Sequence, residues 1–217
     1  MNFQEKIKAT LLNPKNAMKS IAEHPMIEEA VMILGVYAVL GALAAFIRMN
    51  KVTIDYEGFE NMPSSTEAMT TIISMVAVVF GIVGIFILWL AGTGIIHVIS
   101  LALGGEGRFS PQMLTIAGYS FIPMIFASII TLALLFMMEP TTITISKANP
   151  VAMDNNPYML AAGIIATLMQ VWASVILFFG VQSAHRLTPA RSAVAAGIPL
   201  VISVLSLAWN LRMSGIL

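Results

Sequence analysis

The sequence predicts an all-α fold: a polytopic membrane helical bundle with five transmembrane helices and a short amphipathic helical region at the N-terminus. The 217-residue chain is 58% hydrophobic and only 10% charged, whereas roughly a quarter of the residues of an ordinary soluble domain are charged. No charged side chain occurs between Glu67 and Glu106, although a helix needs only about 20 apolar residues to cross a bilayer. Further apolar runs of spanning length lie on both sides of this segment.

Residues 1–25 are predicted to form cytoplasmic or interfacial amphipathic helices ahead of a transmembrane domain at 26–217. Phe3, Ile7 and Leu11 recur at four-residue spacing, which places them on one face of a helix. A helix of this kind lies on a membrane surface with its lysines near anionic headgroups. The alternative is a short helix that is merely exposed to solvent.

Asn13-Pro14 has the form of an N-cap residue followed by proline at the first helical position. This pattern predicts a second short helix that ends near His24, before Pro25. The long apolar runs that come after it predict five spans at about 26–47, 68–103, 110–138, 157–184 and 192–211.

The second and third spans carry special features. The second is nearly twice as long as a bilayer requires, so it must tilt, project beyond the bilayer or break near Gly92 and Gly94. The third is expected to start at a capped Ser110-Pro111 and to kink at Pro123, because proline removes a helical hydrogen bond and clashes with the preceding turn.

Basic residues predict the orientation of the bundle, since cytoplasmic loops carry an excess of lysine and arginine. With the N-terminus inside, the outer segments hold four basic residues: Arg48, Lys51, Lys147 and Arg212. The cytoplasmic segments hold seven: Lys6, Lys8, Lys15, Lys19, Arg108, Arg186 and Arg191. The expected protein is therefore a multi-pass protein of the cell membrane with a cytoplasmic N-terminus and an outer C-terminus. A break of the second span into a hairpin would reverse everything after it.

Composition and motifs exclude several classes of function. Basic and acidic residues both number 11 and cysteine is absent, so we expect no nucleic-acid partner and no thiolate chemistry. No zinc-protease, nucleophile-elbow or Walker-type motif occurs in the sequence, so we expect no enzyme and no cofactor. Gly104, Gly105 and Gly107 predict a tight turn between helices instead of a phosphate cradle, because no lysine and no strand accompany them.

The segment from His97 to Pro123 resembles the Yip1-domain family. Leu103 to Phe109 reads Leu-Gly-Gly-Glu-Gly-Arg-Phe, and Gly118-Tyr119 with Pro123 forms a Gly-Tyr-x-x-x-Pro element. Glu23 to Pro25 and His185 to Leu187 also look like the patterns of this family ahead of the first span and between the last two. The resemblance covers nearly the whole chain.

This resemblance implies a non-enzymatic integral membrane protein of five spans with a cytoplasmic N-terminus. Eukaryotic relatives have a long N-terminal region and associate with small Rab-type GTPases, whereas only about 25 residues precede the first span here. The sequence therefore looks like a short, prokaryotic-type member, for which the family implies a membrane location but no agreed activity. We expect it to act through protein-partner or lipid contacts at the cytoplasmic face. Membrane lipids are expected partners, and a membrane-protein partner or a homo-oligomer is possible.

Two sets of candidate residues follow. Arg108, Arg186 and Arg191 are the candidate partner or lipid contacts, and setting the topology is their alternative role. Gln170 and His97 form a candidate intramembrane polar site, on which the alternative function depends: a small-solute or ion transporter or channel with a hydrated cavity. Gln170 more commonly bonds to a neighbouring helix. The three histidines do not predict a metal site by their spacing.

Overall fold

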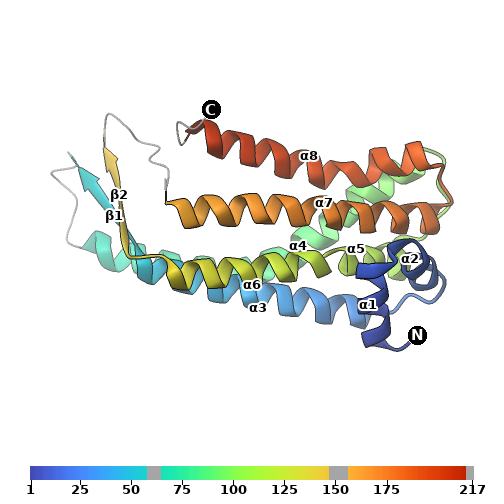
Figure 1. Ribbon diagram of the computed structural model, residues 1–217, viewed down its shortest axis with the longest axis horizontal. Helices are drawn as coiled ribbons and strands as arrows, with labels where there is room; N and C mark the ends of the chain where they lie inside the picture. The colour runs from blue at the N-terminus through green and yellow to red at the C-terminus, as the bar shows by residue number, and fades with distance from the viewer. Residues whose placement is uncertain (58–64, 147–155, 214–217) are drawn as a thin grey trace.

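A computed structural model describes residues 1–57, 65–146 and 156–213 of the chain. Lys147, which enters the charge comparison above, lies outside these residues. Long helices run alongside one another in an elongated bundle, with the two termini at opposite ends (Figure 1). The elements are α1 (Phe3–Leu12), α2 (Pro14–Glu23), α3 (Ile27–Lys51), β1 (Val52–Glu57), α4 (Ser65–Ala102), the π-helical turn η1 (Phe109–Met113), α5 (Leu114–Ser120), α6 (Ile122–Met137), β2 (Thr141–Ser146), α7 (Pro157–His185) and α8 (Pro189–Met213).

The prediction of five spans is confirmed. Five helical segments are long and apolar enough to cross a membrane: Ile27–Lys51, Val78–Ala102, Phe109–Met137, Pro157–His185 and Pro189–Arg212. Large apolar side chains such as Phe80, Leu88 and Phe136 are about 70% exposed, as is expected where lipid instead of water surrounds a helix. The fold is nearly all-α, as predicted.

The second span is one continuous helix. α4 contains 38 residues and is therefore about 57 Å long, without a break at Gly92 or Gly94. The segment Val78–Ala102 within it is by itself long and apolar enough to cross a membrane. A hairpin that reverses the later helices does not form, so α7 and α8 keep the directions that five single crossings require.

The third span is kinked next to Pro123. α5 ends at Ser120 and α6 begins at Ile122, with Pro123 in the first turn of α6. The kink lies just before the proline because the proline ring would clash with the backbone of the preceding turn in a regular helix. The start of the span differs from the prediction: Ser110 has an extended backbone, and the Gln112 side chain accepts the hydrogen bond of the Arg108 N–H at 3.0 Å.

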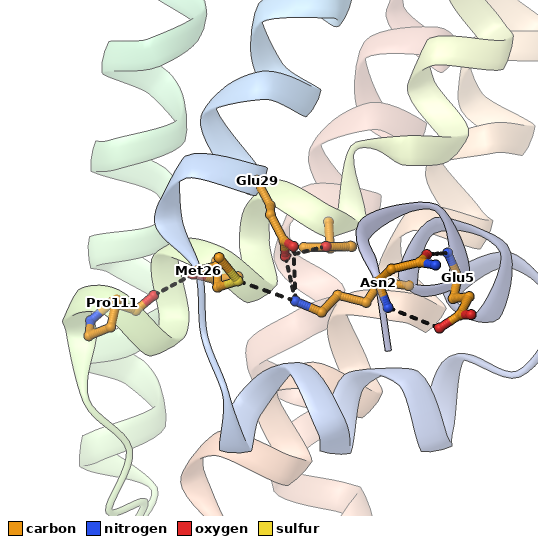
Figure 2. Close-up of polar contacts among 8 residues, drawn as sticks. Asn2, Glu5, Met26, Glu29 and Pro111 are labelled. Carbon is orange, nitrogen blue, oxygen red and sulfur yellow. Dashed lines mark hydrogen bonds and ion pairs between the residues drawn. The ribbon is translucent and has the colours of Figure 1, made fainter.

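The two N-terminal helices are capped by asparagine. Asn2 and Glu5 form a reciprocal capping box at the start of α1, with bonds of 2.8 and 2.9 Å (Figure 2). Asn13 caps α2 and Pro14 is its first residue, and α2 ends before His24, as predicted.

The apolar face of α1 contacts protein. Phe3, Ile7 and Leu11 pack against the main apolar core of the bundle. The sequence placed these side chains together on one face, and the structure shows that α1 packs against α2 and α6, with Phe3 in edge contact with the Tyr119 ring of α5. Whether the outer side of α1 also lies at the lipid interface stays a prediction.

A small sheet was not expected from the sequence. β1 and β2 pair in parallel, with Val52 opposite Thr141. Next to the sheet, the Lys51 Nζ donates hydrogen bonds to the carbonyl oxygens of Phe136 and Met138, which joins the ends of α3 and α6. The alternating Thr and Ile residues of β2 are strong strand formers and are the signal that was missed.

The two ends of the bundle differ, and they are named here by their elements. The α1–α2 end contains α1, α2, the turn from α4 to η1 and the turn from α7 to α8; the β1–β2 end contains the sheet and the last turn of α8 (Figure 1). The main core lies toward the α1–α2 end and includes the fully buried side chains of Met18, Ile116, Tyr119 and Ile176. The first two helices are therefore part of the folded bundle.

Candidate functional site

The Gly-Gly-Glu-Gly segment packs against the end of α7. The N–H of Gly107 donates to Nδ1 of His185 at 3.1 Å, and the N–H of Glu106 donates to the His185 carbonyl at 3.2 Å. A Cβ atom on Gly105 would lie 2.6 Å from the His185 ring, and one on Gly107 would lie 2.9 Å from it. Glycine is required at both positions because the backbone and the ring touch. The tight turn predicted between the second and third spans is thus built on a histidine.

His97 and His185 form a contacting pair. His97 Nδ1 lies 3.2 Å from His185 Nε2, and the ring centroids are 5.0 Å apart. Because His185 Nδ1 accepts from Gly107, we assign the ring proton to Nε2, which donates to His97. A protonated Nε2 is not available to a metal ion.

The three histidines do not meet at one point. Among the described residues, no group of three or more histidine, aspartate or glutamate side chains could hold a metal ion. His24 is exposed at the end of α2. The pair of His97 and His185 therefore serves to hold a turn against a helix, which the spacing of histidines in the sequence did not indicate.

The three candidate arginines come together at the α1–α2 end. All three are exposed; Arg108 and Arg186 belong to the two turns that His185 joins, and Arg191 lies in the first turn of α8. Arg191 donates to the Leu103 carbonyl at 2.9 Å, and Arg186 lies 3.8 Å from Glu106 in an exposed ion pair. Such a pair contributes little to stability. Folding therefore gathers on one surface cations that are up to 83 positions apart in sequence (191 − 108).

A buried ionic network fastens α1 to the bundle. Lys6 Nζ contacts Glu29 Oε2 at 2.7 Å and Oε1 at 3.0 Å, and the Tyr119 hydroxyl donates to Oε2 at 2.6 Å. Both charged side chains are less than a tenth exposed. The Lys6 Nζ also lies 3.7 Å from the Met26 sulfur (Figure 2). Sequence reasoning missed this network: it counted Lys6 among the cytoplasmic basic residues near anionic headgroups and did not pair it with Glu29.

Gly118 and Tyr119, from the Gly-Tyr-x-x-x-Pro element, have distinct structural roles. A Cβ atom on Gly118 would lie 2.3 Å from the Cβ of Ala30, so glycine permits α3 and α5 to touch. Tyr119 is fully buried and reaches Glu29 across this contact. Pro123 begins the next helical segment after the kink. The Gly-Tyr-x-x-x-Pro element thus permits close packing of α3 on α5 and supplies a hydrogen bond to Glu29 at the α1–α2 end.

The two members of the candidate intramembrane site are separated. Gln170 lines a cavity of about 980 Å³ between parts of α3 to α8, whereas His97 is not among the residues that line it. Gln170 donates to Ser174 on its own helix at 3.4 Å. The described residues therefore do not join Gln170 and His97 in one polar path, and no finding supports a transporter.

Five apolar spanning helices, two docked N-terminal helices and glycine-dependent turns define a polytopic α-helical membrane protein with an ordered α1–α2 end. The profile of the Yip1 domain matches residues 8–210. The chain belongs to the Yip1-domain family, as the motifs at Leu103–Phe109 and Gly118–Pro123 predicted.

A relative is found in an archaeon. An uncharacterized protein of Methanocaldococcus jannaschii is 30% identical over 130 residues, which cover 59% of this chain and 87% of that protein. No solved structure matches the chain. The family assignment therefore carries membrane location and fold, and the activity has to be argued from the site.

Proposed function

We propose that this protein is a non-enzymatic integral membrane protein of the Yip1 type that acts through contacts with a protein partner or lipid headgroups at the cytoplasmic face of the cell membrane. In this proposal the α1–α2 end is cytoplasmic and the C-terminus lies outside. The observation that carries it is that Arg108, Arg186 and Arg191 lie on segments that hydrogen bonds join at this end of the bundle.

The hydrogen bonds between these segments support a contact role. The two turns are joined by three hydrogen bonds, from Gly107 and Glu106 to His185 and from Arg191 to Leu103. Cations on a preformed surface lose little conformational freedom when they bind. Arginine is well suited to such contacts because its planar group recognises carboxylate and phosphate through paired hydrogen bonds.

Further cations extend the same surface. Lys8, Lys15 and Lys19 are exposed on α1 and α2, which pack at this end of the bundle. Lysine and arginine next to a span favour a cytoplasmic position and are attracted to the anionic lipids of that leaflet. The orientation and the contact role therefore draw on the same charges.

Photo-crosslinking in native membranes tests this proposal. A photo-reactive amino acid is placed at position 108, 186 or 191, and the matched control is position 212, an exposed arginine at the β1–β2 end. We expect the same protein or the same class of headgroup to be captured at all three test positions and not at the control. Equal capture at position 212, or different products at each test position, would contradict the contact surface.

A further inference from the structure

The cavity that contains Gln170 has the shape and chemistry of a lipid site. Along α7 its lining extends from Met159 to Leu177, a rise of about 27 Å. Its volume of about 980 Å³ is at the upper end of the usual range for ligand pockets, roughly 300–1,000 Å³. A long, narrow space of this kind, parallel to membrane-spanning helices, fits an extended hydrocarbon chain.

The two ends of the cavity differ in polarity. Toward the α1–α2 end its lining is mainly apolar and includes Ile96, Leu177 and Ile198, and the hydroxyl residues there are Thr93 and Ser120. Toward the β1–β2 end the lining includes Arg48, in the last turn of α3, and Asn210, in the last turn of α8. Among the lining residues that the structure describes, Arg48 is the charged one. An occupant with an apolar tail and an anionic head matches this polarity.

Small residues keep the cavity open. Gly92, Gly163 and Ala166 line it, and a Cβ atom on Gly92 would meet no atom within 4 Å. The exposed apolar lining residues Leu88 and Ile202 belong to α4 and α8, so a chain from the bilayer reaches the cavity between these two helices. A space of this size with mostly apolar walls does not stay empty next to lipid tails, because its lining would lose dispersion contacts.

We propose that this cavity binds an anionic membrane lipid, with an acyl chain between α4, α7 and α8 and the headgroup at Arg48. The site lies at the opposite end of the bundle from the arginine surface described above, and it does not depend on the function proposed for that surface. The acyl chain contributes through burial of its methylene groups. The headgroup contributes a charge-assisted hydrogen bond, which makes the site selective for an anion.

Tryptophan fluorescence tests the occupant directly. The chain has three tryptophans: Trp89 lines the cavity and is 8% exposed, whereas Trp209 is not among the lining residues and is 61% exposed. Variants that retain Trp89 alone or Trp209 alone are reconstituted in phosphatidylcholine bilayers. Brominated phosphatidylglycerol or brominated phosphatidylcholine, which quench tryptophan on contact, is then added at equal mole fraction.

We expect phosphatidylglycerol to quench Trp89 with an apparent affinity about tenfold higher than phosphatidylcholine, the size of one charge-assisted hydrogen bond. Trp209 should be quenched equally by both lipids. Arg48→Gln should abolish the preference at Trp89, and the matched Arg212→Gln, at an exposed site of the same end, should retain it.

A second pair of variants fills the space. Gly92→Leu is expected to reduce quenching of Trp89 by both lipids. Gly81→Leu, at an exposed position about three turns earlier on the same helix that does not line the cavity, should leave it unchanged. The proposal is overturned if neither lipid quenches Trp89, which would indicate a water-filled or closed cavity. It is also overturned if the two lipids quench Trp89 equally or if Trp209 shows the same preference. Should Gly92→Leu fail to fold, the Arg48 and Arg212 variants decide alone.

Discussion

Replacing Lys6 by methionine is expected to loosen α1 from the bundle. The substitution keeps a long apolar side chain but removes the cation that faces Glu29 at 2.7 Å. Glu29 would then be a buried carboxylate with only the Tyr119 hydroxyl, at 2.6 Å, as a described partner. An unpaired charge in this position destabilises the folded state because it is removed from water without compensation.

The magnitude follows from the geometry and burial of the pair. Two unit charges 2.7 Å apart attract by about 6 kcal/mol at an effective dielectric constant of about 20. The cost of taking both charges out of water offsets much of this energy, yet removal of one partner typically costs about 3–5 kcal/mol. The remaining hydrogen bond from Tyr119 favours the lower value, about 3 kcal/mol. For a chain of this size the midpoint of unfolding would fall by about 6–12 °C.

Thermal unfolding of the full chain in one detergent measures this effect. Lys8→Met, at an exposed position of the same helix, is the matched control and should change the free energy of unfolding by less than about 0.5 kcal/mol. The double variant Lys6→Met/Glu29→Gln should be more stable than Lys6→Met by about 1–2 kcal/mol, because the orphaned charge is gone. The reasoning is refuted if Lys6→Met behaves like Lys8→Met, or if the double variant is less stable than the single one.

Three other predictions concern the packing and the orientation of the bundle. Gly118→Ala should destabilise the protein by about 1–3 kcal/mol through overpacking. The double variant Gly118→Ala/Ala30→Gly should recover part of this loss, as measured by thermal unfolding. His185→Phe removes the ring nitrogen that accepts the Gly107 N–H, at a cost of about 1–3 kcal/mol. Amide hydrogen exchange in the glycine turn should therefore become faster. Since the chain lacks cysteine, single cysteines replacing Lys8 and Arg212 should react with an impermeant maleimide from the cytoplasmic and the outer side, respectively.

Each of these three has an outcome that contradicts it. An additive loss from the changes at Gly118 and Ala30 would show that the two positions do not touch. Unchanged exchange in the turn after His185→Phe would show that the ring does not hold it. Labelling of both cysteines from the same side would overturn the opposite placement of the termini.

The sequence determined the spans because the constraint behind them is local. A helix must satisfy its own backbone hydrogen bonds in lipid, and each crossing needs an apolar run of a given length. The observed helices therefore coincide with the predicted runs to within a few residues. Caps at Asn13 and the kink at Pro123 were predictable for the same reason, since each depends on residues within one or two turns of the chain.

The continuity of α4 and the pairing of the small sheet are two features that local sequence patterns did not predict. Length alone left open whether the second span tilts, projects or breaks, and the structure shows one continuous helix. The parallel pairing of β1 with β2 joins segments about 90 residues apart, and no local pattern states which strand pairs with which. Pairing of this kind is decided by where the helices place the strands.

Only the tertiary structure decided which polar groups meet. Lys6, Glu29 and Tyr119 come from three different helices, and His97 and His185 are 88 positions apart in the sequence. Each of these residues has an ordinary local explanation, so the sequence pattern did not mark them as partners. Arg108, Arg186 and Arg191 were predicted together as contacts at the cytoplasmic face, but the hydrogen bonds that join the segments carrying them depend on glycines that allow two turns to touch. The sequence determined which segments cross the membrane, because each segment must meet the length and hydrogen-bonding requirements of the bilayer by itself. The contacts between segments depend on how all of them pack together.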